Sequence, residues 1–150
     1  MARLEFSVEI AAPLDRVFVF FVPQRMVYWY NAEMQVEFEV EDGASEFALG
    51  QKVRITGRIG RREVSLTAVV TCYEWLRAFE WRFHDAYGVK GLQSWQLKPL
   101  AESRTRVTMR DTYELPGWFG HLWDALLMRH AVARRDRSSL ARLKFLSERT

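Results

Sequence analysis

Hydrophobic and polar residues alternate along most of the chain up to residue 115, a pattern typical of strands with one buried face. The first such run is LEFSVEI at 4–10, in which every second residue is apolar. Between 34 and 115 the same period of two recurs in six further runs separated by short turns. The pattern therefore predicts seven strands, six of them consecutive, which is typical of an antiparallel meander.

Two short helices are predicted between the first two strands. Pro13 suits a first helical turn, and Asp15 follows near the amino end of the segment 14–22. Pro23 ends this helix and can open a second one over 24–31. Because neither helix is long enough to be stable alone, each must rest on an apolar surface.

After Pro116-Gly117, apolar residues recur at helical spacing from 118 to about 147. A helix of about 30 residues is roughly 45 Å long, enough to cross a small sheet. Every strand has one apolar face, and only this helix is long enough to cover it. We therefore expect a strongly curved sheet that grips the last helix, with an apolar gap beneath it that the two short helices cover. Small-molecule sites commonly lie in such concave spaces.

The composition fits one globular domain over residues 1–150. The chain is 49% hydrophobic, which excludes disorder, and its single cysteine excludes an internal disulfide or a zinc cluster. No apolar run reaches the roughly 18 residues of a membrane helix, and the amino terminus has no signal-peptide core. We expect a cytoplasmic protein that is a monomer or a homodimer.

Charge is distributed unevenly, although the net charge is only +3. Residues 1–75 hold 8 basic and 11 acidic side chains, and residues 76–150 hold 14 and 8. The densest basic cluster, Arg134 to Arg142, is interrupted by Asp136 and is typical of a solvated helix face. Nucleic-acid binding is therefore not expected, because it would require an extended basic face. Weak contact with an acidic partner or with anionic lipid head groups remains an alternative.

Five segments resemble the START/Bet v1-like (SRPBCC) superfamily, which includes polyketide cyclase/dehydrase and lipid-transport members. They are VEIAAPLDRVFVFF at 8–21, Trp29, SWQLKPL at 94–100, TRVTMRDTYELPG at 105–117 and SLARLKFLSER at 139–149. The resemblance covers the whole chain and implies a helix-grip fold of the α+β class. In this fold a seven-stranded curved antiparallel sheet surrounds a long C-terminal helix, with two short helices after the first strand. The superfamily hosts cyclases, aromatases, hydrolases, hormone receptors and lipid carriers, so the fold does not settle the activity.

The family arrangement also implies that the first and last strands are neighbours. Glu5 and Glu9 would then lie opposite Arg106 and Arg110 on the solvent face. Glu37 and Glu39 would likewise face Arg54 or Arg58.

Asp111 is the sharpest candidate for chemistry, since it is in phase with apolar Val107 and Met109. A buried carboxylate is costly unless it is paired or protonated. Asp111 is therefore a pocket acid, or a partner of a buried arginine, or it lies in a bulge that turns it outward. Arg129 is its natural partner, either as a clamp for an anionic group or as a residue at the edge of the apolar stripe that reaches solvent.

Tyr113 also faces inward, where its ring packs and its hydroxyl can serve as a proton donor. Gln93 fits a pocket polar group or a strand end. We place the candidate catalytic role on Asp111, Tyr113 and Arg129. The expected ligand-binding set adds apolar residues that line either the core or the pocket, and it comprises Phe38, Trp81, Phe83, Gln93, Trp95, Met109, Asp111, Tyr113, Leu122, Leu126 and Arg129.

No metal or other cofactor is expected. His84 lies on the polar phase of its strand, and His121 and His130 are more than two helical turns apart. No sequence motif for a nucleotide or a serine nucleophile is present.

Two functions remain open, and a third is weaker. The first is a binding module whose cavity holds a small hydrophobic ligand such as a lipid, a polyketide or a quinone-like ring. The second is an enzyme resembling a polyketide cyclase or aromatase, in which pocket polar groups transfer protons. The third is protein interaction through the arginine-rich last helix.

Overall fold

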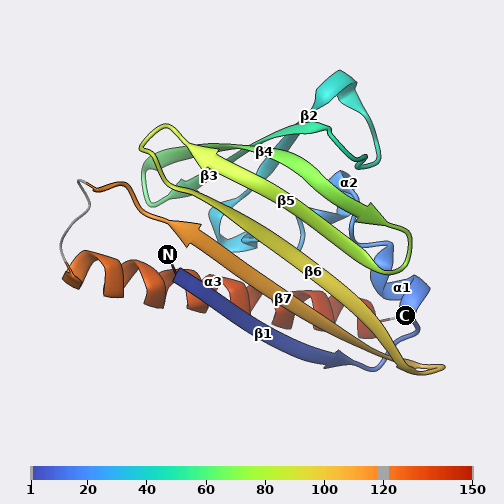
Figure 1. The fold of residues 1–150 in the computed structure, drawn as a ribbon. Coiled ribbons are helices and arrows are strands. Elements are labelled where there is room, and N and C mark those ends of the chain that lie inside the picture. The colour runs from blue at the N-terminus through green and yellow to red at the C-terminus, as the bar shows by residue number, and fades with distance from the viewer. Residues whose placement is uncertain (1, 118–121, 150) are drawn as a thin grey trace.

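The protein is a seven-stranded antiparallel sheet curved around one long helix, α3 (Figure 1). The computed structural model describes residues 2–117 and 122–149, without the side chains of 122–125. The strand order β1-β7-β6-β5-β4-β3-β2 makes β1 and β2 the two edges. The strands are β1 Ala2–Ile10, β2 Glu37–Val40, β3 Lys52–Ile59, β4 Arg62–Glu74, β5 Ala78–Asp85, β6 Lys90–Ala101 and β7 Arg104–Glu114.

The helices are α1 Leu14–Phe18, α2 Pro23–Met26 and α3 Leu122–Glu148, with 3-10 turns at Ala32–Met34 and Glu41–Gly43. The two short helices lie where the sequence predicts them, but both end early. After α1 the chain turns through hydrogen bonds three residues apart, from Phe20 to Val17 and from Phe21 to Phe18. This tighter winding lets Phe18 and Phe21 stack on one another within the core, with ring centroids 5.6 Å apart.

The predicted pairing of the first and last strands is confirmed. Glu5 lies opposite Arg110 and Glu9 lies opposite Arg106 in the β1–β7 register. Arg110 Nε donates to Glu5 Oε1 at 2.6 Å, and Arg106 Nη2 donates to Glu9 Oε1 at 3.1 Å. Such exposed pairs contribute little stability, but they mark this face of the sheet as the wet one.

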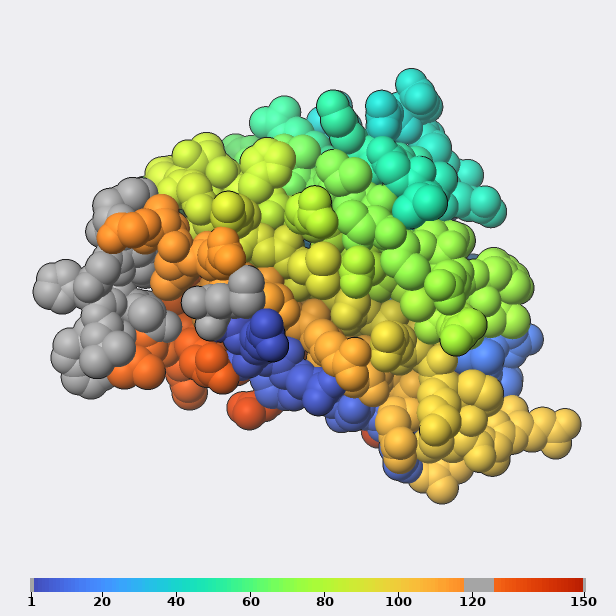
Figure 2. All heavy atoms as spheres, viewed as in Figure 1, coloured from blue at the N-terminus to red at the C-terminus, as the bar shows by residue number. Residues whose placement is uncertain are grey.

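At the other edge the pairing is partly as predicted, because Glu39 lies opposite Arg54 while Glu37 lies opposite Thr56. Figure 2 shows the outer face of the sheet, where side chains of β5, β6 and β7 lie side by side. The alternating burial along these strands places their apolar residues on the opposite, concave side.

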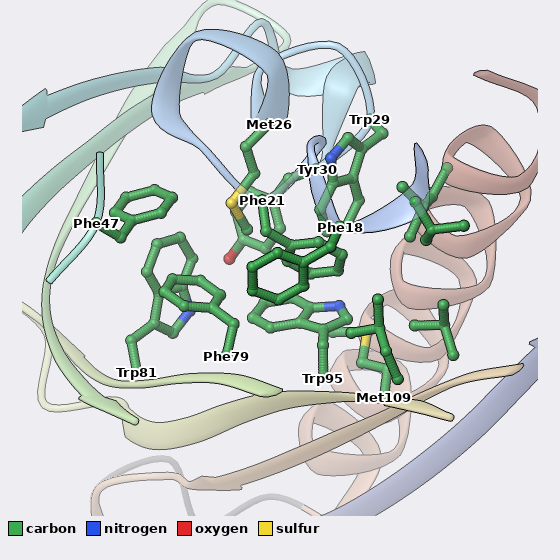
Figure 3. Close-up of a cluster of buried hydrophobic side chains, with 14 of the residues drawn as sticks. Phe18, Phe21, Met26, Trp29, Tyr30, Phe47, Phe79, Trp81, Trp95 and Met109 are labelled. Atoms are coloured by element: carbon green, nitrogen blue, oxygen red, sulfur yellow. The ribbon is translucent and has the colours of Figure 1, made fainter. Parts of the chain in front are cut away.

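One half of the concave side is filled by aromatic rings, which we call the aromatic core: Phe18, Phe21, Trp29, Tyr30, Phe47, Phe79, Trp81 and Trp95 (Figure 3). Phe79, Trp81 and Trp95 project from the sheet toward the rings of the segment that contains α1 and α2. The ring centroids of Phe79 lie 5.1 Å from Trp81 and 5.7 Å from Trp95. This half of the interior is solid.

The long helix α3 makes most of its contacts with the sheet along the edge strand β1. Leu140 and Leu143 in its second half are buried, whereas Leu126 and Leu127 near its start are 50% and 62% exposed. The helix is therefore packed less tightly near its start than in its second half. None of the described helices is long and apolar enough to cross a membrane.

Candidate functional site

A cavity of about 230 Å³ lies between the amino-terminal half of α3, the β3–β4 hairpin and strands β5 to β7. Its apolar wall includes Val36, Ile55, Leu66, Phe83 and Val132, and Ile59 at its mouth is 53% exposed. Its polar wall consists of Tyr30, Asn31, Ser65, Asp85, Gln93, Asp111, Tyr113, Arg135 and Asp136. The cavity is thus mainly apolar, with one acidic group each on β5, β7 and α3.

A glycine on β6 shapes this wall. Gly91 lies opposite both Phe83 on β5 and Tyr113 on β7. A Cβ atom there would lie 2.2 Å from the carbonyl oxygen of Thr112 and 2.8 Å from the Phe83 ring. Only glycine leaves this space free, so Gly91 allows the Phe83 ring to lie over β6 beside the cavity.

Two carboxyl groups form the most unusual feature of the cavity, and we call Asp111 and Asp136 the acid pair. They come from β7 and α3 and are only 2% and 3% exposed. Their side chains are close enough for one carboxyl group to donate a hydrogen bond to the other. Two carboxylates cannot share such a contact when both are ionised, so one of them must hold a proton.

A chain of hydrogen bonds sets the orientation of Gln93 beside the acid pair. Trp81 Nε1 donates to Gln93 Oε1 at 2.9 Å, and the Tyr30 hydroxyl donates to the same oxygen at 2.7 Å. Because an indole nitrogen can only donate, this atom of Gln93 is the oxygen. The amide nitrogen therefore donates to Asp111 Oδ2, at 3.2 Å.

This orientation decides which acid holds the proton. Asp111 accepts from Gln93 and from Asp136, and both bonds favour its ionised form, although burial raises its pKa overall. Asp136 has no such donor, and burial together with the negative charge of Asp111 raises its pKa to about 9. At neutral pH, Asp111 is therefore a carboxylate that accepts a hydrogen bond from the protonated carboxyl group of Asp136.

The residues around the acid pair do not use all of its capacity to accept hydrogen bonds. Within the described residues, no group outside the acid pair donates to Asp111 Oδ1 or to Asp136 Oδ2, and the Tyr113 hydroxyl is buried without a hydrogen-bond partner. Arg135 lines the same wall and lowers both acid pKa values, yet its Nη1 lies against Met34 Sδ at 3.5 Å. Tyr30 is placed by the next residue, Asn31, whose backbone N–H donates to Ser139 Oγ on α3 at 3.0 Å.

The structure brings four of the sequence-predicted residues to the cavity, namely Phe83, Gln93, Asp111 and Tyr113. Four others, Phe38, Trp81, Trp95 and Met109, pack in the hydrophobic core instead. The neighbouring aromatic rings occupy the space in front of them. Trp81 still acts on the site, because its N–H fixes the orientation of Gln93.

Arg129 and Leu126 do not line the cavity, in contrast to the sequence-based expectation. Arg129 is exposed and donates to the carbonyl oxygen of Arg3 at 3.2 Å. Both residues lie in an outer groove between α3 and β1. Arg129 lies at the edge of the apolar face of α3, and its long side chain points away from the cavity. The partner of Asp111 is Asp136 instead. The side chain of Leu122 and all of His121 lie outside the described residues.

Metal binding has no support in the part of the chain that the structure describes. No group of three or more His, Cys, Asp or Glu side chains there could hold an ion.

A family model described as "Polyketide cyclase / dehydrase and lipid transport" matches residues 1–148. The chain belongs to this family. No curated protein matches it.

Solved structures share the fold of this polyketide cyclase/dehydrase and lipid transport family member at low identity. The Zhui aromatase/cyclase from a Streptomyces species is 18% identical with a TM-score of 0.74, over 99% of this chain and 94% of its own. The di-domain ARO/CYC BexL is 18% identical with a TM-score of 0.76, over 99% of this chain and 47% of its own. A Chromobacterium violaceum protein is 13% identical with a TM-score of 0.74, over all of both chains.

Of the polar wall in this family member, sequence reasoning found Gln93, Asp111 and Tyr113 and missed the other six residues: Tyr30, Asn31, Ser65, Asp85, Arg135 and Asp136. Asp136 interrupts a run of arginines, which favoured a solvated face. A signal was nevertheless present, because Asp136 is four residues from both Val132 and Leu140 and so shares their helix face. Tyr30 had no comparable signal, since it follows α2 in a turn whose direction depends on Asn31 and Ser139.

Proposed function

We propose that this protein binds a small, mainly apolar molecule in the cavity beside the acid pair. The observation that carries the proposal is the contrast between the solid aromatic core and the adjoining hollow of about 230 Å³. Well-packed interiors contain few voids larger than a water molecule. A hollow of this size with an apolar wall therefore has room for a small apolar ligand.

The size of the cavity limits the ligand class. A dry cavity of roughly 150 Å³ holds benzene. A volume of about 230 Å³ suits one or two rings, or a short segment of a longer molecule that leaves through the mouth at Ile59. A long lipid chain does not fit inside without a rearrangement of the aromatic core.

Filling the cavity tests this proposal. Val132→Phe places a ring in the hollow, whereas Ala131→Phe places the same ring on the exposed side of α3. Calorimetry measures the binding of naphthalene. We expect naphthalene to bind wild type and Ala131→Phe, and to bind Val132→Phe at least about tenfold more weakly. Native mass spectrometry of freshly purified protein then identifies any natural ligand. Equal naphthalene affinity in all three proteins, or no binding to wild type, would contradict the proposal.

A second candidate function is enzymatic dehydration, which the split protonation of the acid pair favours. Two neighbouring carboxyls with different pKa values are a common arrangement for a base and an acid that act together. With Asp136 protonated and Asp111 ionised at neutral pH, both roles are available at one wall.

In a ligand with a hydroxyl group β to a carbonyl, the Asp111 carboxylate takes the proton from the carbon between them. That electron pair forms the carbon–carbon double bond, the carbon–oxygen bond breaks, and the hydroxyl leaves with the Asp136 proton as water. The pair ends with one proton, now on Asp111. The reaction consumes no external acid or base. The cycle is complete when the proton returns from Asp111 to Asp136.

A two-ring test compound fits the cavity size. Loss of water from 3-hydroxy-1-tetralone gives an enone that tautomerises to 1-naphthol, which is followed by its fluorescence. The enzyme hypothesis predicts a rate above buffer that Asp111→Asn abolishes, while naphthalene binding by this variant persists. If the compound binds but is not converted, the binding function stands and the proposed dehydration is contradicted.

A further inference from the structure

We propose that the acid pair makes the cavity selective for neutral ligands that carry a hydroxyl group, and that it excludes carboxylates. This inference rests on the proposed binding function and names its substrate class. It follows from which polar atoms of the wall already have partners and which do not.

The unused atoms of the wall are mainly acceptors. In the described part of the chain, no group outside the acid pair donates to Asp111 Oδ1 or to Asp136 Oδ2, and the Tyr113 hydroxyl has no partner. Asp111 Oδ2 is already occupied by the Gln93 amide. A buried acceptor without a donor costs about 1–3 kcal/mol. A ligand hydroxyl that donates to Asp111 Oδ1 removes this cost, while an apolar ligand leaves it in place.

A carboxylate ligand would add acceptors and a negative charge to a wall that already has both. Gln93 cannot rotate to offer more donors, because Trp81 Nε1 and the Tyr30 hydroxyl both hold its oxygen. Arg135 lies on the same wall, but its guanidinium contacts Met34 Sδ and the carbonyl oxygen of Ala131, both at 3.5 Å. No ion pair between Arg135 and either acid occurs among the described residues.

A cationic ligand is disfavoured for a different reason. One proton already neutralises half of the acid pair, and the positive charge of Arg135 acts on both acids from α3. The third acid of the wall, Asp85, already accepts hydrogen bonds from the backbone N–H groups of Tyr87 and Val89. An ammonium group would therefore leave water for a site in which no carboxylate lacks a compensating group.

Four matched two-ring probes separate these cases by calorimetry at neutral pH: naphthalene, 2-naphthol, 2-naphthoate and 2-(aminomethyl)naphthalene. We expect 2-naphthol to bind at least about tenfold more tightly than naphthalene, which is the effect of one hydrogen bond to a charged group. The naphthoate and the ammonium probe should bind more weakly than naphthalene.

Variants assign the selectivity to the acid pair. Asp111→Asn should lower the ratio of 2-naphthol to naphthalene affinity by about fivefold or more. Asp136→Asn should keep the ratio, because the asparagine amide still donates to Asp111. Asp15→Asn, at an exposed acid on α1, is the matched control.

The outcomes distinguish this inference from the proposed function. If naphthalene and 2-naphthol bind equally well, the cavity binds ligands but the selectivity is absent. Tighter binding of the naphthoate or of the ammonium probe than of 2-naphthol also overturns the inference. If no probe binds wild type, the proposed function itself fails. The four-probe comparison on wild type does not depend on whether the variants fold.

Discussion

The two halves of the interior differ in what fills them. In one half, rings from the sheet and from the segment containing α1 and α2 interlock, as Trp95 shows by contacting Phe21, Trp29 and Phe79 at centroid distances of 5.7 to 6.2 Å. In the other half the same sheet faces a cavity of about 230 Å³. Both halves are lined by strands β5, β6 and β7, so the difference comes from what lies across from them.

This contrast separates stability from binding along the same strands. Phe79 and Phe83 share a face of β5, yet Phe79 is fully buried among rings and Phe83 is a half-buried wall of the cavity. Residues of the aromatic core hold the sheet to the helical segment, and residues of the hollow half keep a space open. The polar chain from Trp81 through Gln93 to Asp111 joins the two halves.

The largest expected effect is a comparison of two phenylalanines on β5. Phe79→Ala should lower the free energy of unfolding by about 3–5 kcal/mol, because it leaves a cavity among packed rings. Phe83→Ala should cost only about 1–2 kcal/mol, because its ring is half-buried beside existing space. Urea denaturation measures both. Equal losses would show that the hollow half is packed as tightly as the aromatic core.

The next effect concerns pH and the acid pair. Asp136 ionises near 3.8 when unfolded but has a pKa of about 9 in the folded protein. Between these values the folded state holds a proton that the unfolded state has released, so the free energy of unfolding falls as the pH rises. Each pKa unit corresponds to about 1.4 kcal/mol, which makes even part of this shift measurable.

Asp136→Asn should flatten this dependence and make the variant more stable than wild type at alkaline pH. Urea denaturation at several pH values checks it, with Asp15→Asn following wild type. Glu9 and Glu148 have lowered pKa values and act in the opposite sense in both proteins. A difference in stability between wild type and Asp136→Asn that does not change with pH would therefore contradict the shared proton.

The smallest effect compares two tyrosine hydroxyls. Tyr30→Phe removes a donor to Gln93 and should cost about 1 kcal/mol. Tyr113→Phe should be neutral within about 0.5 kcal/mol, since its hydroxyl is buried without a partner among the described residues. Thermal unfolding of the two variants measures the difference. A cost for Tyr113→Phe as large as that for Tyr30→Phe would indicate a partner that binds this hydroxyl in solution.

The strands could be predicted from the sequence because each is a local pattern, whereas the pairing of β1 with β7 was implied by the resemblance to the SRPBCC superfamily. Alternation places Asp111 and Tyr113 on the inner face of β7 and Arg110 on the outer one. Helix ends were predicted less well, since α1 and α2 are shortened to let their rings reach the core.

The sequence by itself determined the strands and the long helix, since these follow from periods of two and of 3.6 residues, and it placed Asp111 in phase with the apolar residues of β7. Only the tertiary structure decided that Asp111 points inward, that its partner is Asp136, that Arg129 lies outside, and that one half of the interior is hollow. The physical reason is that a period fixes the face of an element but not its lateral position. The placement of α3 along β1 determines where the space remains and which side chains meet in it.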